Sequence, residues 1–193
     1  MKAFFSKYGY NIFKLFLNQF AIALFGIALA VACGKAQNNT LQWVTSIFAV
    51  LFYLFLEYAA MWEIGAKDGI SAVARKTSRK LWRGAVIALC ANVLNILLAI
   101  LILPGAIAPG TKAQGFSSVV SVIALMIEGM YTGILAQPFR GLSLNQYAWV
   151  YFAIIVPAVL VSAGAYILGS YDLHLTNILI PKNKDVKDNG RRK

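Results

Sequence analysis

The chain has 193 residues, of which 60% are hydrophobic and 13% are charged, and its formal net charge is +11 at pH 7. A soluble domain of this length could not bury so much apolar surface in one core, so the composition excludes an ordinary soluble domain and predicts an integral membrane protein. Lysine and arginine lie at the edges of the apolar stretches and in a few loops, which is typical of membrane orientation rather than of a nucleic-acid partner.

Five apolar stretches follow one another along the chain, and each is about as long as a helix that crosses a bilayer. They are Leu15–Cys33, Leu41–Trp62, Gly84–Leu103, Phe116–Leu135 and Tyr147–Leu168. The segments between them are too short for a second domain. We therefore predict an all-α integral membrane protein, in which residues 15–168 form a bundle of four to five transmembrane helices with amphipathic interfacial segments. Residues 1–14 are predicted to be an N-terminal interfacial segment, and residues 169–193 a basic C-terminal tail.

The N-terminal segment carries aromatic and aliphatic residues at helical spacing beside three lysines. These residues are Phe4, Phe5, Tyr8 and Ile12. The pattern predicts a short helix that lies on the inner leaflet before the first crossing. The apolar run that follows is too long for a removed signal peptide and lacks a small-residue cleavage site close enough. We therefore expect the N-terminus to be cytoplasmic.

The segment Glu63–Arg83 carries six basic residues against two acidic ones, which predicts a cytoplasmic loop. Its apolar residues fall on one helical face, so we expect it to lie on the membrane surface, separated from the second stretch by a break at Gly69. Anionic lipid headgroups are favoured over nucleic acid as its partner. The residues expected to contact the headgroups are Arg75, Lys76, Arg79, Lys80 and Arg83.

The fourth stretch, Phe116–Leu135, contains Glu128. Inserting this acid into the bilayer costs roughly 2.5 to 3.5 kcal/mol of free energy, which can cancel the favourable insertion free energy of the apolar residues in the stretch. If this stretch crosses the bilayer, the tail lies outside, with ten of the 18 Lys and Arg residues inside and eight outside. If it re-enters on the outer side, the tail is cytoplasmic, and fifteen lie inside against three outside. The positive-inside rule favours the second topology. The fifth stretch is expected to be kinked by Pro157.

Three polar residues, Asn18, Glu57 and Asn92, fall roughly 7 to 12 Å inside the cytoplasmic ends of their stretches. Stripes of small residues should form the bundle interior, and Glu57 is expected to face Asn92 across them. The predicted polar or ligand pocket consists of Asn18, Glu57, Asn92, Asn95 and Glu128. An ionisable residue at this depth is a candidate functional site. The alternative is that Lys14, Arg83 or interfacial water satisfies Glu57, which would then only lock helix positions.

No set of nucleophile and base, no cluster of metal ligands and no phosphate-binding glycine loop can be recognised in the sequence. We therefore expect no enzyme activity, no metal site and no cofactor. The lone histidine, His174, is expected to be a surface residue rather than a ligand.

Short motifs along most of the chain resemble a set of small multi-spanning membrane proteins of Firmicutes that has no assigned function. They are Tyr10-Asn11, Asn18-Gln19, Phe25-Gly26, Trp62-Glu63, Gly65-Ala66-Lys67-Asp68, Leu81-Trp82-Arg83-Gly84, Ala91-Asn92, Met130-Tyr131-Thr132-Gly133 and Leu168-Gly169-Ser170-Tyr171. The resemblance implies a multi-pass protein of a bacterial plasma membrane and implies no chemistry. The substrate-binding components of vitamin transporters are similar in length and hydropathy, but they use six crossings.

Two classes of function remain open. The first is a small transport or ligand-binding membrane subunit with a polar pocket in its cytoplasmic half. The second is a non-catalytic membrane interaction or assembly protein that binds a membrane-protein partner, a second copy of itself or anionic lipid. A cavity that reaches Glu57 would favour the first class, and a solid bundle the second.

Overall fold

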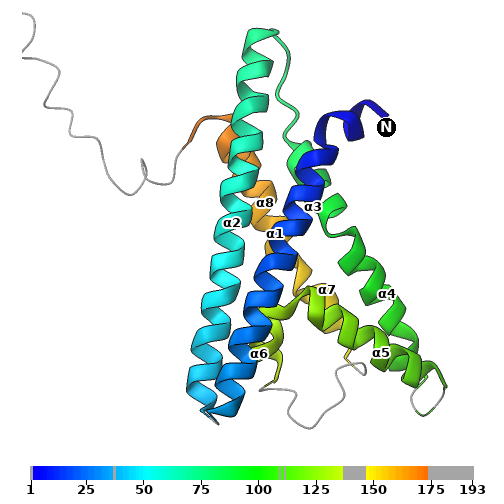
Figure 1. Ribbon diagram of the computed structural model, residues 1–193. Helices are drawn as coiled ribbons and strands as arrows, with labels where there is room; N and C mark the ends of the chain where they lie inside the picture. The colour runs from blue at the N-terminus through cyan, green and yellow to red at the C-terminus, as the bar shows by residue number, and fades with distance from the viewer. Residues whose placement is uncertain (1, 37, 109, 111, 137–146, 174–193) are drawn as a thin grey trace, which may run out of the picture.

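The computed structural model describes residues 2–36, 38–108, 110, 112–136 and 147–173, and these residues form helices and no strand (Figure 1). The predicted all-α fold is therefore confirmed. The elements are α1 (Lys2–Lys35), α2 (Asn39–Ala74), α3 (Trp82–Ala91), α4 (Val93–Ile107), α5 (Lys112–Ile127), η1 (Gly129–Tyr131), α6 (Thr132–Ala136), α7 (Trp149–Ala153) and α8 (Ile155–Ser170).

Among the described residues, three helical segments are long and apolar enough to cross a membrane. They are α1, α2, and α7 with α8 taken together as Trp149–Ser170. Two bent pairs pass the same test: α3 with α4, which meet at 59°, and α5 with the segment after it, which meet at 92°. The described chain thus offers three to five candidate spans.

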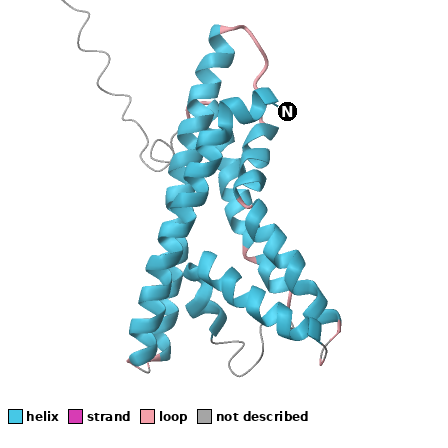
Figure 2. Cartoon of the chain, turned by 45° about the vertical axis from the view of Figure 1, so that its right-hand side comes forward, coloured by secondary structure: helices cyan, strands magenta, loops and turns pink. Residues whose placement is uncertain are grey.

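The helices run back and forth between two ends of an elongated bundle (Figures 1 and 2). One end, called the Asp68 end below, holds the start of α1, the end of α2, the start of α3 and the end of α8. Hydrogen bonds from Tyr8 of α1 and Tyr166 of α8 to Asp68 of α2 fix this arrangement. The opposite end, called the Lys35 end, holds the turn between α1 and α2. The start of α1 and the end of α8 therefore lie at the same end of the bundle.

Residues 112–136 form a hairpin that enters the bundle and leaves it at the Lys35 end (Figure 2). Near the start of α5, the Ser117 hydroxyl accepts a hydrogen bond of 2.9 Å from the Gly105 amide at the end of α4. At the bend, the backbone of Met130 packs against Gly26 of α1. On the way out, the Ile134 amide donates to the hydroxyl of Ser46, near the start of α2, at 3.1 Å. By length and composition, this bent segment is either a broken span or a re-entrant segment.

The first two helices are longer than their apolar stretches. Helix α1 is continuous, so the structure has no boundary between residues 14 and 15. The side chain of Tyr8 is buried with Leu15 against α2, α3 and α8 instead of facing outward. At about 1.5 Å per residue, α2 is about 54 Å long and extends well beyond an apolar core of about 30 Å. The part of α2 after Trp62, which includes Asp68, accounts for the excess.

The predicted break at Gly69 is wrong, because α2 runs through this residue to Ala74. A Cβ atom at Gly69 would overlap the carbonyl of Ser170, so the glycine serves close helix packing rather than helix termination. The predicted surface helix is also shorter than expected. Only its beginning, with Ile70 and Val73, is helical, and the chain is irregular from Arg75 to the start of α3.

Two other helix interruptions have local causes. The Asn92 side chain donates to the carbonyl of Ala88, one turn earlier, and the helix breaks there into α3 and α4. Pro157 has no amide to donate to the carbonyl of Ala153, and α7 ends at that residue. The kink expected from Pro157 thus takes the form of a one-residue interruption at Ile154.

The predicted small-residue stripes do face the interior. Ala49, Ala88, Ala99, Ala158, Ser162 and Ala165 are all buried. The closest packing joins α2 to α8, where Gly65, Gly69 and Gly169 contact the backbone of the facing helix. The outer surface carries many exposed large apolar side chains, among them Phe48, Phe55 and Leu160. A contiguous apolar exterior of this kind is typical of a surface that faces lipid.

Candidate functional site

Two carboxylic acids are buried inside the bundle. Glu57 of α2 is 2% exposed, and Glu128, at the bend between α5 and η1, is 3% exposed. Neither forms an ion pair within the part of the chain that the structure describes. Burying an acid without a basic partner is costly, so this arrangement calls for a chemical explanation.

Glu57 is held by α8. The Ser162 hydroxyl donates a hydrogen bond of 2.8 Å to Oε1 of Glu57. No hydrogen bond joins Glu57 to Asn92, the residue it was expected to face, among the described contacts, and α8 packs against both α2 and α3. Asn92 instead accepts a hydrogen bond of 3.0 Å from Asn95, so the two asparagines form a pair of their own.

The basic residues proposed as alternative partners of Glu57 lie elsewhere. Lys14 is exposed, and Arg83 contacts Tyr8 and Asp68. Glu57 is therefore not neutralised by either of them.

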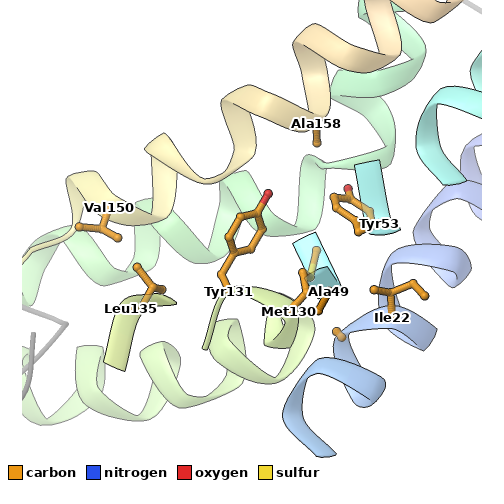
Figure 3. Packing of buried hydrophobic residues seen from close by; sticks show 9 residues of the cluster. Ile22, Ala49, Tyr53, Met130, Tyr131, Leu135, Val150 and Ala158 are labelled. Atoms are coloured by element: carbon orange, nitrogen blue, oxygen red, sulfur yellow. The ribbon is translucent and has the colours of Figure 1, made fainter. Parts of the chain in front are cut away.

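Two buried tyrosines, Tyr53 and Tyr131, lie near the buried acids. Tyr53 precedes Glu57 by one helical turn of α2, and it also lies within electrostatic range of Glu128 and Tyr131. Figure 3 shows the Tyr53 and Tyr131 rings in one layer, with both hydroxyl groups on the side of Ala158 of α8. One group of buried polar side chains is thus formed by Glu57, Tyr53, Tyr131 and Glu128, and we call it the carboxyl line.

Several buried polar atoms near this line have no hydrogen-bond partner among the described residues. They are the hydroxyl oxygens of Ser121, Tyr131, Thr132 and Tyr151 and the amide oxygen of Asn95. An unsatisfied buried polar group costs about 1 to 3 kcal/mol, and most such groups in proteins are satisfied. The hydroxyl group of Tyr131 therefore has hydrogen-bonding capacity that the described protein groups do not use.

The predicted pocket residues do not all come together. Glu57 and Glu128 belong to the carboxyl line, Asn92 and Asn95 pair with each other, and Asn18 is only half-buried. The next residue, Gln19, is the buried one, at 3% exposed. The helical spacing of Leu15, Gln19 and Gly26 on one face would have identified it. Nothing in the sequence pattern identified Ser162 as the partner of Glu57.

A second cluster surrounds Asp68 and joins four helices. Lys7 Nζ lies 2.5 Å from Asp68 Oδ1, the Tyr166 hydroxyl donates to Oδ2 at 2.6 Å, and the Tyr8 hydroxyl also donates to Oδ2. Arg83 of α3 completes the cluster, with Nη1 3.9 Å from Oδ2. Burial by itself raises the pKa of Asp68, but the hydrogen bonds from Lys7, Tyr166 and Tyr8 outweigh it and hold this pKa below its ordinary value.

The predicted headgroup residues surround the Asp68 end. The guanidinium of Arg79 lies 4.5 Å from the centre of the Tyr171 ring, which fixes its position. Arg83 is turned toward Tyr8 and Asp68, whereas Arg75, Lys76 and Lys80 form no ion pair with the described residues.

Within the described ranges, no three His, Cys, Asp or Glu side chains are close enough to hold a metal ion. His174 and the basic tail after Leu173 lie outside the residues that the structure describes.

Comparison of the chain with models of protein families, with curated proteins and with solved structures gives no match. The function is therefore inferred from the residues and their geometry.

Proposed function

We propose that the chain is a multi-pass protein of a bacterial plasma membrane that crosses the bilayer four times, with residues 112–136 as a re-entrant hairpin. The apolar exterior and the length of the helices support insertion. In this topology the Asp68 end is cytoplasmic. Nine described Lys and Arg residues lie at that end, and only Lys35 and Lys112 lie at the other, as the positive-inside rule requires.

Within this topology, we propose that the protein is a small transport or ligand-binding subunit whose site is the carboxyl line. The observation that carries this proposal is the burial of Glu57 and Glu128 with no basic partner among the described residues, beside the Tyr131 hydroxyl, which these residues also leave without a hydrogen bond. Acids and hydroxyls without a positive counter-charge suit a proton or a small cation. Interrupted helices and re-entrant segments are typical of such sites, because irregular backbone at membrane depth is tolerated where it is buried in protein or lines a cavity.

The position of the acids along the bundle supports passage rather than simple binding. Glu57 lies near the Asp68-end limit of the stretch Leu41–Trp62, and Glu128 precedes Gly129, which packs against α1 closer to the Lys35 end. The carboxyl line therefore extends beyond the cytoplasmic half in which the polar pocket was expected.

A different observation favours the second class of function. Three clefts at the Asp68 end are lined by residues of α1, α2, α3 and α8 and the segments next to them, and neither Glu57 nor Glu128 lines any of them. Clefts that do not reach the buried acids are what a non-catalytic interaction or assembly protein would show. The flux experiment below decides between the two classes.

Proton and cation flux into proteoliposomes that contain the full-length protein tests the transport function. We expect flux above that of protein-free vesicles, and at least a tenfold decrease in Glu57→Gln and in Glu128→Gln, because glutamine keeps the shape but cannot release a proton or hold a cation. Glu63→Gln is the matched control, since Glu63 is an exposed acid on the same helix as Glu57, paired only with Lys67. Its flux should equal that of the wild type. The proposal would be contradicted if wild-type flux is no higher than that of empty vesicles, or if flux is unchanged in both Glu57→Gln and Glu128→Gln. The interaction or assembly protein would then be the remaining class of function.

A further inference from the structure

A cleft of about 720 Å³ opens at the Asp68 end between the first turns of α1, the end of α2 and the segment that leads into α3. Its lining contains five basic side chains and a single acid, Asp68. The basic side chains are Lys7, Arg75, Arg79, Lys80 and Arg83. Positive charge therefore strongly exceeds negative charge in this cleft.

The contacts of these side chains show which of them remain available. Lys7 already binds Asp68, and Arg83 contacts it more distantly, while the described residues provide no ion-pair partner for Arg75 or Lys80. Arg79 is held over Tyr171 by a cation–π contact, which restricts its guanidinium to one region of the cleft. The hydroxyls of Ser71, Thr77 and Ser78 also line the cleft. Guanidinium, ammonium and hydroxyl groups together are the donors that bind phosphate in proteins.

A second, largely apolar groove of about 400 Å³ adjoins this cleft. The two share Gly69, Arg79 and Ser170, so Arg79 stands at the boundary between the basic and the apolar space. The groove is lined by Ile70 and Val73, which are 72% and 64% exposed. A free phosphate ion would make no contact with an apolar groove beside its site, whereas the acyl chain of a phospholipid can pack in it.

We propose that the paired clefts are a specific site for one anionic phospholipid, with the phosphate bound near Arg79 and Lys80 and an acyl chain along Ile70 and Val73. Trp82, which lines the basic cleft and is 59% exposed, suits the level of the headgroups. The site differs from a general attraction of basic residues to the membrane surface, because it depends on particular side chains at one position. It is also independent of the carboxyl line, so either proposal can fail alone.

Native mass spectrometry of the full-length protein in a neutral detergent, titrated with phosphatidylglycerol or with phosphatidylcholine, tests the site. We expect the anionic lipid to bind more tightly than the zwitterionic one. The double variant Arg79→Gln, Lys80→Gln should bind phosphatidylglycerol roughly 30-fold more weakly, because each basic residue near anionic lipid contributes about a fivefold increase in affinity. The matched control is the double variant Lys35→Gln, Lys112→Gln, which removes the same charge from the opposite end and should bind like the wild type.

Equal weakening in both double variants would show that net charge alone attracts the lipid, and it would overturn the specific site. Unchanged binding of phosphatidylglycerol by the double variant Arg79→Gln, Lys80→Gln would also overturn the specific site. Competition with inorganic phosphate distinguishes a site for a phospholipid from a site for a free phosphate ion. The double variant Ile70→Ser, Val73→Ser makes the apolar groove polar. The assignment to lipid is overturned in favour of free phosphate if millimolar phosphate displaces the lipid from the wild type and if this variant binds both phosphate and lipid as well as the wild type does.

Discussion

Replacing Gly65 with alanine is expected to lower the free energy of unfolding in detergent by about 3 kcal/mol, the upper part of the range for overpacking a closely packed site. A Cβ atom at Gly65 would overlap the carbonyl of Tyr166 on α8. The atoms in its way belong to backbone, so no side chain can rotate aside, and α2 and α8 must separate. Their separation would also weaken the hydrogen bond from the Tyr166 hydroxyl to Asp68. Unfolding in a sodium dodecyl sulfate titration, followed by circular dichroism, measures the change.

The chain offers a matched control on the facing helix. A Cβ atom at Gly164 of α8 would meet no atom within 4 Å. Gly164→Ala should therefore leave the protein equally stable, or up to about 1 kcal/mol more stable through the better helix propensity of alanine. Equal destabilisation by Gly65→Ala and Gly164→Ala would contradict the close contact between α2 and α8.

Asp68→Asn is expected to destabilise the protein by about 1.5 to 3 kcal/mol, because the charged oxygens accept three hydrogen bonds from two different helices, α1 and α8. An asparagine keeps one acceptor but removes the negative charge that Lys7 faces. By contrast, Glu63→Gln breaks a pair whose side chains are both largely exposed, and it should change stability by less than about 1 kcal/mol. The thermal midpoints of the two variants in the same detergent give the comparison.

The effect of Asp68→Asn should also depend on pH. The folded-state pKa of Asp68 is lowered, so its contribution to stability is fully present above the unfolded pKa of about 3.9 and is lost as the pH falls through the lower folded value. The stability difference between wild type and Asp68→Asn should therefore be constant near neutrality and shrink in acid. If the stability difference between wild type and Asp68→Asn stays constant down to the lowest pH at which both proteins remain folded, the carboxylate charge is not what binds Lys7 and the tyrosines.

The inward faces of α2, α3, α4 and α8 could be predicted from the sequence, because small and polar residues recur at helical spacing on the side that packs against other helices. The burial of Glu57, Asn92 and Asn95 follows from this pattern. The ambiguity of the fourth stretch could also be recognised, since Glu128 offsets its apolar residues, and the chain bends by 92° at that residue.

The neighbours of each helix could not be predicted in the same way. Periodicity shows which face is buried but not which helix covers it, so it could not show that α8 supplies Ser162 as the hydrogen-bond donor to Glu57. Gly69 was read as a helix break because glycine is a poor helix former, whereas its role depends on a contact with Ser170 more than 100 positions away in the sequence. The cluster around Asp68 joins four helices, and no local pattern predicts such an arrangement.

The topology is the claim on which the proposed function depends, and thiol labelling tests it most directly. Single cysteines at Thr40, Thr77 and Asn189, introduced into a chain with Cys33→Ala and Cys90→Ala, are exposed in intact cells to a membrane-impermeant maleimide. Thr40 lies in the first turn of α2 at the Lys35 end, Thr77 lies at the Asp68 end, and Asn189 belongs to the tail outside the described residues. Four crossings with a re-entrant hairpin predict labelling of Thr40→Cys in intact cells and of the other two only after permeabilisation. Ready labelling of Asn189→Cys in intact cells would mean that residues 112–136 cross the membrane, and equal labelling of Thr40→Cys and Thr77→Cys would mean that α2 does not.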